Sequence, residues 1–316
     1  MITRAPAHES TPAGACPKCG AAFAPRWFPD GYSQSDGALC ASGLLDPPPN
    51  RAGSASTLLT YDQGSGQTLR RVLASLSARL GPPSQYAGDN RGPSVRWRWP
   101  AQTVTLTAPR GLCPQVAVAR TRELEQAETA SFRRAAGALP YLWRYQPGPA
   151  CLPSPTAGEA PSWNHLQEAL QTVLRASCSD LVPLVGSEGA GFNIVDVRNR
   201  RWRLCVIVSP SENILLAVDD HGGPTGCVGA HSMRQRGWQT FVPLLRMWDA
   251  EFPLGDAGAA SAARLLLSEM HHRNVRSPGD LRLTHVSSGD RGQLDIPGLC
   301  IRPAEPSDIT PRAVAS

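Results

Sequence analysis

The sequence contains almost no lysine. Lys18 is the single lysine. Lysine and arginine together number 31, so all the rest are arginines. Two functional explanations are avoidance of lysine modification and use of the bidentate guanidinium to contact phosphates. A third needs no function, because a GC-rich genome enriches arginine, alanine, glycine and proline together. The sequence shows that wider bias, and we favour the third explanation.

The chain also lacks long hydrophobic segments. No run of about 18 apolar residues is present, and no apolar signal segment lies at the amino terminus. We therefore expect a cytoplasmic protein without membrane attachment, in which thiols are reduced. The nine cysteines fit this expectation, since their number is odd and most of them occur singly.

The motifs of common enzyme classes are missing as well. The sequence has no GxSxG elbow, Walker A loop, GxGxxG turn or HExxH pair. The net charge of +5 is mild and the arginines are spread along the chain, which permits nucleic-acid binding but does not indicate it. We therefore expect a non-enzymatic binding or adaptor protein that engages a macromolecule, with protein favoured over nucleic acid.

One short motif does indicate a specific chemistry, the CPKCG run that contains Cys16 and Cys19. Two thiolates separated by two residues can bind one zinc ion, because the tight turn directs both sulfurs to the same side. The run resembles one knuckle of the zinc-ribbon and rubredoxin-like class, which implies a structural zinc site. The second CxxC pair of a ribbon is missing. We therefore assign Cys40 as the third ligand and His8 as the fourth.

Two alternatives to zinc remain for the CxxC pair. One is a pair of cysteines without a metal. The other is a redox pair of the thioredoxin type, which needs the motif at the start of a helix so that the helix dipole lowers a thiol pKa. Pro25, Pro29 and Gly31 follow too closely for such a helix.

The chain contains 30 prolines and 29 glycines, which interrupt helices and strands and favour loops. We predict an α+β fold, in which a small amino-terminal zinc knuckle precedes two helix-plus-antiparallel-hairpin units joined by a Pro-rich linker. The predicted parts are a flexible arm with the knuckle in 1–50, a small α+β domain in 51–145, a Pro/Gly-rich linker in 146–161, a larger α+β domain in 162–303, and a disordered tail in 304–316.

Apolar periodicity predicts the individual elements. Gly81 and the two prolines after it end the first helix, and Ser162 can cap the third. Trp97 and Trp99 share one strand face and are assigned to the core. Helices are predicted over 69–80, 121–138, 163–174, 240–252 and 256–272. Strands are predicted over 95–99, 104–106, 192–197, 202–208, 214–218, 281–286 and 294–301.

The richest polar cluster begins at the end of a predicted strand with Asp219, Asp220 and His221, and His231 follows ten residues after His221. Carboxylates and imidazoles at a strand end suit a metal or acid–base chemistry. The alternative function is therefore a metal-dependent hydrolase or nuclease, with Glu269 and His272 as a helical ligand pair. An ordinary loop has the same composition.

Arginine and tryptophan dominate binding hot spots, and they occur together twice in the second half of the chain. The candidate partner-binding residues are Arg200, Trp202, Arg234, Arg236 and Trp238. For Trp238 the competing interpretation is a place in the core. The stretch around Trp202 could also contact a phosphate backbone or form a solvated strand rim.

Overall fold

The computed structural model describes residues 39–40, 65–134, 139–147, 158–185, 189–198, 203–209, 213–219, 227–288, 292–305 and 308. The protein is α+β, as predicted, and most of its strands pair antiparallel. Residue contacts divide the chain into two units, the first made of 1–84 and 94–124 and the second of 85–93 and 125–316. The predicted linker at 146–161 thus lies within the second unit. None of the helices in the described residues is long and apolar enough to cross a membrane.

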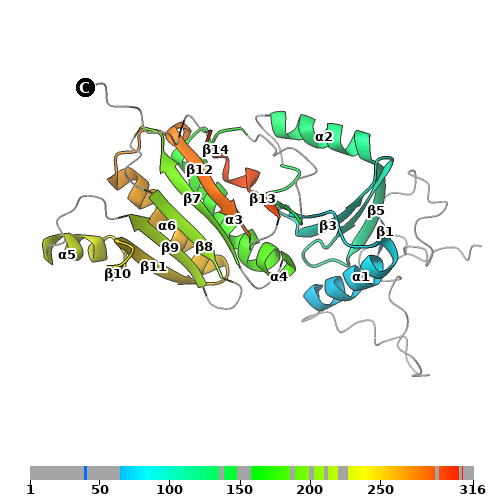
Figure 1. Cartoon of the computed structure of the whole chain (residues 1–316), viewed down its shortest axis with the longest axis horizontal. Helices are drawn as coiled ribbons and strands as arrows, with labels where there is room; N and C mark the ends of the chain where they lie inside the picture. The colour runs from blue at the N-terminus through cyan, green and yellow to red at the C-terminus, as the bar shows by residue number, and fades with distance from the viewer. Residues whose placement is uncertain are drawn as a thin grey trace, which may run out of the picture. The chain divides into compact units, whose positions relative to one another are not determined.

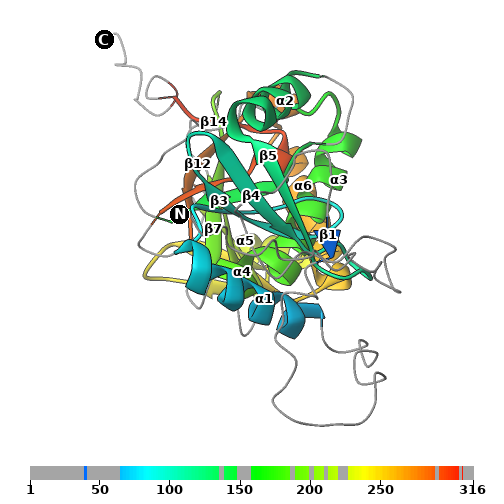
Figure 2. The same cartoon turned by 90° about the vertical axis from the view of Figure 1, so that its right-hand side faces the viewer.

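The first unit packs one helix against an antiparallel sheet. Its elements are α1 (Ser65–Leu80), β1 (Leu39–Cys40), β3 (Pro93–Arg98), β4 (Gln102–Thr107) and β5 (Gln115–Arg120). The strands lie in the order β1-β5-β4-β3, and Figures 1 and 2 show α1 running beneath them. Alternate strand residues and one face of α1 are apolar and buried, as the two periodicities require. These core residues are Leu69, Val72, Leu76, Val95, Trp97, Val104, Leu106 and Val116.

The predicted stop at Gly81 serves two purposes. Gly81 has a φ of +83°, in the left-handed region that favours glycine, and its N–H donates to the Ser77 carbonyl at 3.0 Å. Its carbonyl accepts a 2.8 Å hydrogen bond from Nε1 of the buried Trp97. Trp99, predicted to lie in the core, follows the end of β3 and is 38% exposed.

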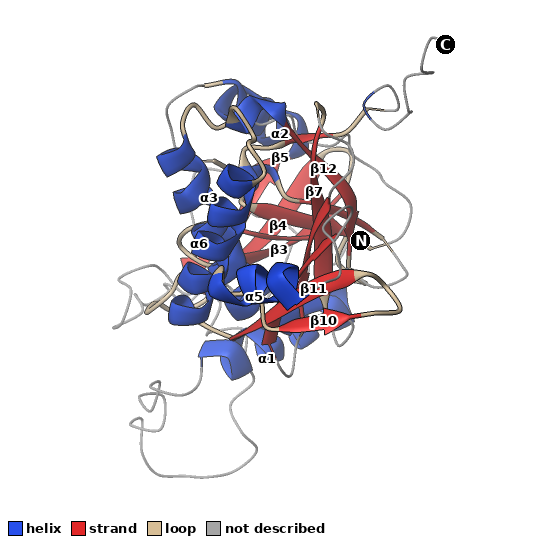
Figure 3. Ribbon diagram, turned by 90° about the vertical axis from the view of Figure 1, so that its left-hand side faces the viewer, coloured by secondary structure: helices blue, strands red, loops and turns tan. Residues whose placement is uncertain are grey.

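The second unit contains a seven-stranded sheet with one face covered by helices. Its order is β10-β11-β9-β8-β7-β12-β14, antiparallel except for the β12/β14 pair. The strands are β7 (Ala190–Asp196), β8 (Arg203–Val208), β9 (Asn213–Asp219), β10 (Thr240–Val242), β11 (Met247–Pro253), β12 (Leu281–Ser287) and β14 (Arg302–Pro303). Two helices, α3 (Trp163–Ala176) and α6 (Asp256–His272), pack side by side on this sheet, as Figure 3 shows.

The core of the second unit lies between this sheet and the two helices. Alternate strand residues such as Ile194, Leu204 and Leu216 are fully buried, and so is the apolar face of α3. Ser162 caps α3, since its side chain accepts from the His165 N–H at 3.2 Å. The predicted helices at 163–174 and 256–272 and the strands of β7, β8 and β9 are therefore confirmed.

A second group of strands in this unit has the order β2-β6-β13 and is antiparallel. These strands are β2 (Gln85–Gly88), β6 (Trp143–Gln146) and β13 (Gln293–Asp295). The remaining helical elements are α2 (Thr121–Arg133), the π-helix η3 (Ser177–Leu181), α4 (Val182–Val185), α5 (Cys227–Gln235), and the 3-10 turns η4 (Pro278–Asp280) and η5 (Pro297–Leu299).

Two predicted elements are wrong. The helix expected over 240–252 is the hairpin β10–β11, whose strands pair from Thr240 with Asp249 to Val242 with Met247. The strand expected over 294–301 is interrupted, because Pro297 begins the 3-10 turn η5 between β13 and β14.

Candidate functional site

The predicted zinc ligands lie almost entirely outside the described residues. His8, Cys16 and Cys19 are not among them, and Cys40 is described through its backbone alone, in β1 opposite Gln115. The zinc site therefore stays a prediction. Within the part of the chain that the structure describes, no three or more His, Cys, Asp or Glu side chains are grouped to hold a metal ion.

The predicted hydrolase cluster is only partly described, since Asp220 and His221 lie outside the described residues. Asp219 ends β9, is 6% exposed, and has a carboxylate oxygen 3.5 Å from Nη2 of Arg203. His231 lies on the exposed side of α5, with its Nε2 2.8 Å from Nε2 of Gln235. Asp219 is thus engaged with an arginine, and His231 with a residue of its own helix.

The predicted ligand pair on α6 does not form. Glu269 is 1% exposed, whereas His272, three residues later, is exposed to solvent. Glu269 instead accepts hydrogen bonds from Nε1 of Trp238 at 2.9 Å and from Nε of Arg273 at 2.7 Å. Nε of Arg236 lies 3.5 Å from the same carboxylate. Glu269 is therefore the buried centre of a charged network and not a metal ligand.

This network corrects the assignment of Trp238 to a partner-binding surface. Trp238 is 1% exposed, and its indole N–H is satisfied by Glu269, so it belongs to the core. Arg236 is half-buried beside the same carboxylate, whereas Arg234 is exposed on α5. Arg200 and Trp202 lie outside the described residues.

The three cysteine thiols that the structure describes in the second unit, Cys178, Cys205 and Cys300, offer little nucleophilic chemistry. Burial raises the pKa of Cys178, Cys205 and Cys300 above the ordinary value of a thiol. The neighbouring Arg203 lowers the pKa of Cys205, but less than burial raises it. A thiol with a raised pKa is protonated near neutral pH and attacks poorly.

The most exposed large apolar residues of the described chain lie at one point, the turn between β10 and β11. Leu244 is 92% exposed and Leu245 is 63% exposed. The turn is closed by a hydrogen bond of 3.2 Å from the Arg246 N–H to the Pro243 carbonyl. We call Leu244, Leu245 and the exposed Arg246 the hairpin tip.

The hairpin tip lies where the sequence pattern predicts a helix, over 240–252, and that pattern therefore gives no sign of it. The first turn residue, Pro243, and the alternation of Trp248, Ala250 and Phe252 with two acidic residues could have indicated the hairpin.

No protein-family model matches the chain, and a search of curated proteins finds no significant match. Function therefore has to be inferred from the geometry of the chain itself.

Proposed function

We propose that the protein is a non-enzymatic binding or adaptor protein, which inserts the hairpin tip into an apolar cleft of a partner protein. The observation that carries the proposal is the 92% exposure of Leu244 beside the 63% exposure of Leu245. Central turn positions normally carry glycine, proline, asparagine, aspartate or serine. Two leucines in that place expose apolar surface to water, which is unfavourable, and they contribute little to the core. A partner that buries them explains their presence.

The position of the tip supports its use as a contact. Directly beneath it, Val242 and Met247 pair across the hairpin and are half-buried, so the apolar surface continues along the strands. The opposite face of the hairpin is anchored, because Phe241 packs against the buried Trp248 with ring centroids 5.3 Å apart. The leucines are therefore presented by an ordered support and lose little freedom on binding.

The chemistry of the tip favours protein over nucleic acid. Nucleic acid binds chiefly through cations that contact phosphates, and the tip offers one arginine, Arg246, beside two aliphatic side chains. Its convex apolar shape fits a hydrophobic cleft, and Arg246 adds a positive charge that suits an acidic rim on the partner.

Replacing both tip leucines by serine tests the proposal. If each leucine buries about 1.5 kcal/mol of apolar contact, the variant Leu244→Ser/Leu245→Ser should bind its partner roughly a hundredfold more weakly. Its stability should change by less than about 0.5 kcal/mol, because both side chains are exposed. A photo-cross-linking residue at position 245 captures the partner in the native host, and the purified pair then gives the affinity.

A matched control is Leu254→Ser, which changes another exposed leucine, 37% accessible and just past the carboxyl end of β11. This variant should retain full affinity. Equal affinity of the wild type and the tip variant for the captured protein would contradict the proposal.

We propose in addition that zinc shapes the amino-terminal segment through Cys16, Cys19, Cys40 and His8. The CxxC spacing supports it. Elemental analysis of the purified chain should give about one zinc ion per molecule. The variant Cys16→Ser/Cys19→Ser should contain close to none, whereas Cys178→Ser should keep the metal. An unmodified chain purified without chelator and found free of zinc would refute the site.

A further inference from the structure

A cavity of about 330 Å³ lies in the second unit, between β12, β13, η5 and β14. That volume is within the range of about 300–1,000 Å³ that small-molecule sites occupy. The walls are mostly apolar, and five of the side chains that form them are Leu283, Val286, Leu294, Ile296 and Ile301. The cavity is therefore an apolar site of a size that could take a small organic molecule.

The backbone beside this cavity is strained at His285. Its φ is +49°, in the left-handed region that a histidine seldom adopts. The β12/β7 pairing shifts register between Thr284 and Ser287, so His285 lies in a β-bulge. Bulges of this kind redirect side chains next to functional sites, and strain persists there when it serves a function. The imidazole is exposed and has no hydrogen-bond partner among the described residues.

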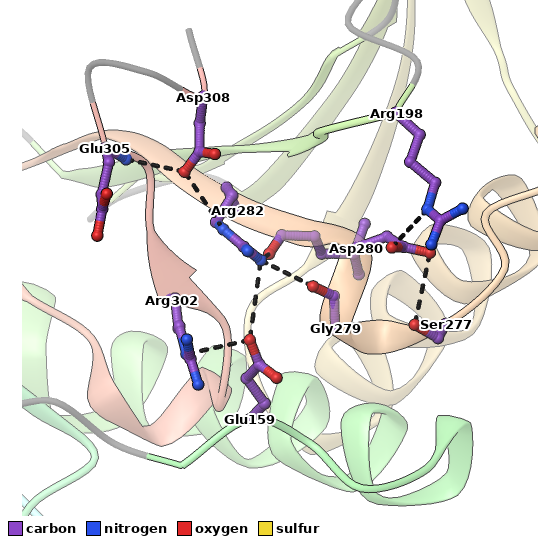
Figure 4. A network of polar contacts seen from close by, with 10 residues as sticks. Glu159, Arg198, Ser277, Gly279, Asp280, Arg282, Arg302, Glu305 and Asp308 are labelled. Carbon is purple, nitrogen blue, oxygen red and sulfur yellow. Dashed lines mark hydrogen bonds and ion pairs between the residues drawn. The ribbon is translucent and has the colours of Figure 1, made fainter.

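Arg302 supplies a positive charge to the same lining. Its Nε lies 3.0 Å from a carboxylate oxygen of Glu159, and its side chain is 55% exposed, so the guanidinium is open to a ligand. Arg282 also lies near Glu159, with its Nη1 3.9 Å from the same oxygen. Figure 4 shows Arg282 and Arg302 on either side of Glu159, with Asp308 also 3.4 Å from Arg282.

The one carboxylate in the lining is already occupied. Asp295 accepts from Nε and Nη2 of Arg144 at 3.0 and 2.6 Å through Oδ2, and from Nε2 of Gln293 at 3.0 Å through Oδ1. Three further residues of the lining carry a side-chain hydrogen-bond donor: Thr284, His285 and Arg302. All three can donate hydrogen bonds, and one of them is permanently positive.

We propose that this cavity binds a small aliphatic carboxylate, with its chain against the apolar walls and its head group held by Thr284, His285 and Arg302. A carboxylate matches the excess of donors, and a charge-assisted bond to arginine is stronger than a neutral one. The site is separate from the hairpin tip, so it does not depend on the proposed protein partner.

Titration calorimetry of the full chain with octanoate tests the proposal, with octanol and octylamine as probes of the same chain length. Octanoate should bind saturably, octanol at least tenfold more weakly, and octylamine not measurably. The variant Ala304→Trp, which fills the cavity from its half-buried rim, should abolish octanoate binding while the chain stays folded. The variant Arg302→Gln should lose the preference for octanoate over octanol.

The variant His285→Gly tests whether the strained backbone at position 285 serves ligand binding or only the fold. Glycine removes the imidazole and accepts a positive φ, so this variant should melt at or above the temperature of the wild type and yet bind octanoate at least fivefold more weakly. His285→Asn, which tolerates the same backbone and keeps a donor, should bind within about twofold of the wild type. Absence of saturable octanoate binding by the wild type, equal affinity for octanol, or full binding by Ala304→Trp would each overturn the proposal.

Discussion

Replacing Glu269 with alanine is expected to destabilise the second unit by about 3–5 kcal/mol. The side chain of Glu269 is fully buried, while those of Arg236 and Arg273 beside it are only 20% and 18% exposed. Removing the carboxylate takes the buried negative charge away from two poorly hydrated guanidinium groups and leaves the Trp238 indole N–H unsatisfied in the core. Urea unfolding followed by circular dichroism measures the loss, and hydrogen exchange of α6 peptides shows whether the second unit is the part that opens.

Glu269→Gln is the matched variant for this experiment. An amide oxygen can still accept from Trp238 but no longer balances the two guanidinium groups, so the loss should be intermediate. Pairing Glu269→Ala with Trp238→Phe in a double-mutant cycle measures the coupling of indole and carboxylate, and Glu269→Gln, which keeps that bond, reports the ion pairs. A decrease of less than about 1 kcal/mol in the free energy of unfolding for Glu269→Ala would show that the network is hydrated and contributes little to stability.

The elements that the sequence predicted well are those with complete local information. The helices α1, α3 and α6 carry apolar residues at helical spacing, and α1 and α3 have a capping residue at one end: Gly81 ends α1 and Ser162 begins α3. Buried apolar residues alternate along β7, β8 and β9. In each of these cases local propensity agrees with tertiary packing, and agreement at both levels makes a sequence predictable.

The hairpin β10–β11 shows what defeats such prediction. Leu244 and Leu245 fall at helical spacing with Phe241 and Trp248, so the pattern predicts a helix. That pattern counts every leucine as buried, and these two are exposed. Exposed leucines break the relation between apolarity and the core of the chain, and a rule that assigns apolar residues to the core fails at these two positions.

The cavity and the buried networks could not be predicted, because their members meet only after folding. Trp238 and Glu269 are 31 positions apart, and Arg144 and Asp295 are 151 apart. The charged residues nearest to Trp238 in the sequence are Arg234 and Arg236, and this pattern predicts an exposed binding surface. The indole N–H of the buried Trp238 is satisfied by a carboxylate from α6, and no local spacing in the sequence indicates this contact.

The second large effect is expected at Asp295. Its carboxylate joins β13 to β6 by holding Arg144, and the two side chains are 9% and 4% exposed. Asp295→Ala should therefore cost about 3–5 kcal/mol, since the buried guanidinium of Arg144 loses the carboxylate that holds it at 2.6 Å. The melting temperature and hydrogen exchange of the β6 and β13 peptides measure the effect.

An apolar replacement of the whole pair distinguishes the cost of a broken ion pair from the value of an intact one. In Arg144→Met/Asp295→Leu no charge is left buried, and such exchanges are often neutral or stabilising, so most of the loss seen in Asp295→Ala should be recovered. Because Asp295 also lines the cavity, this folded double variant has one charged group fewer beside Arg302. The double variant should still bind octanoate, since the carboxylate oxygens of Asp295 accept hydrogen bonds from Arg144 and Gln293 and are not needed for the ligand. A double variant as unstable as Asp295→Ala would mean that packing between β6 and β13, and not the buried charge, sets the cost.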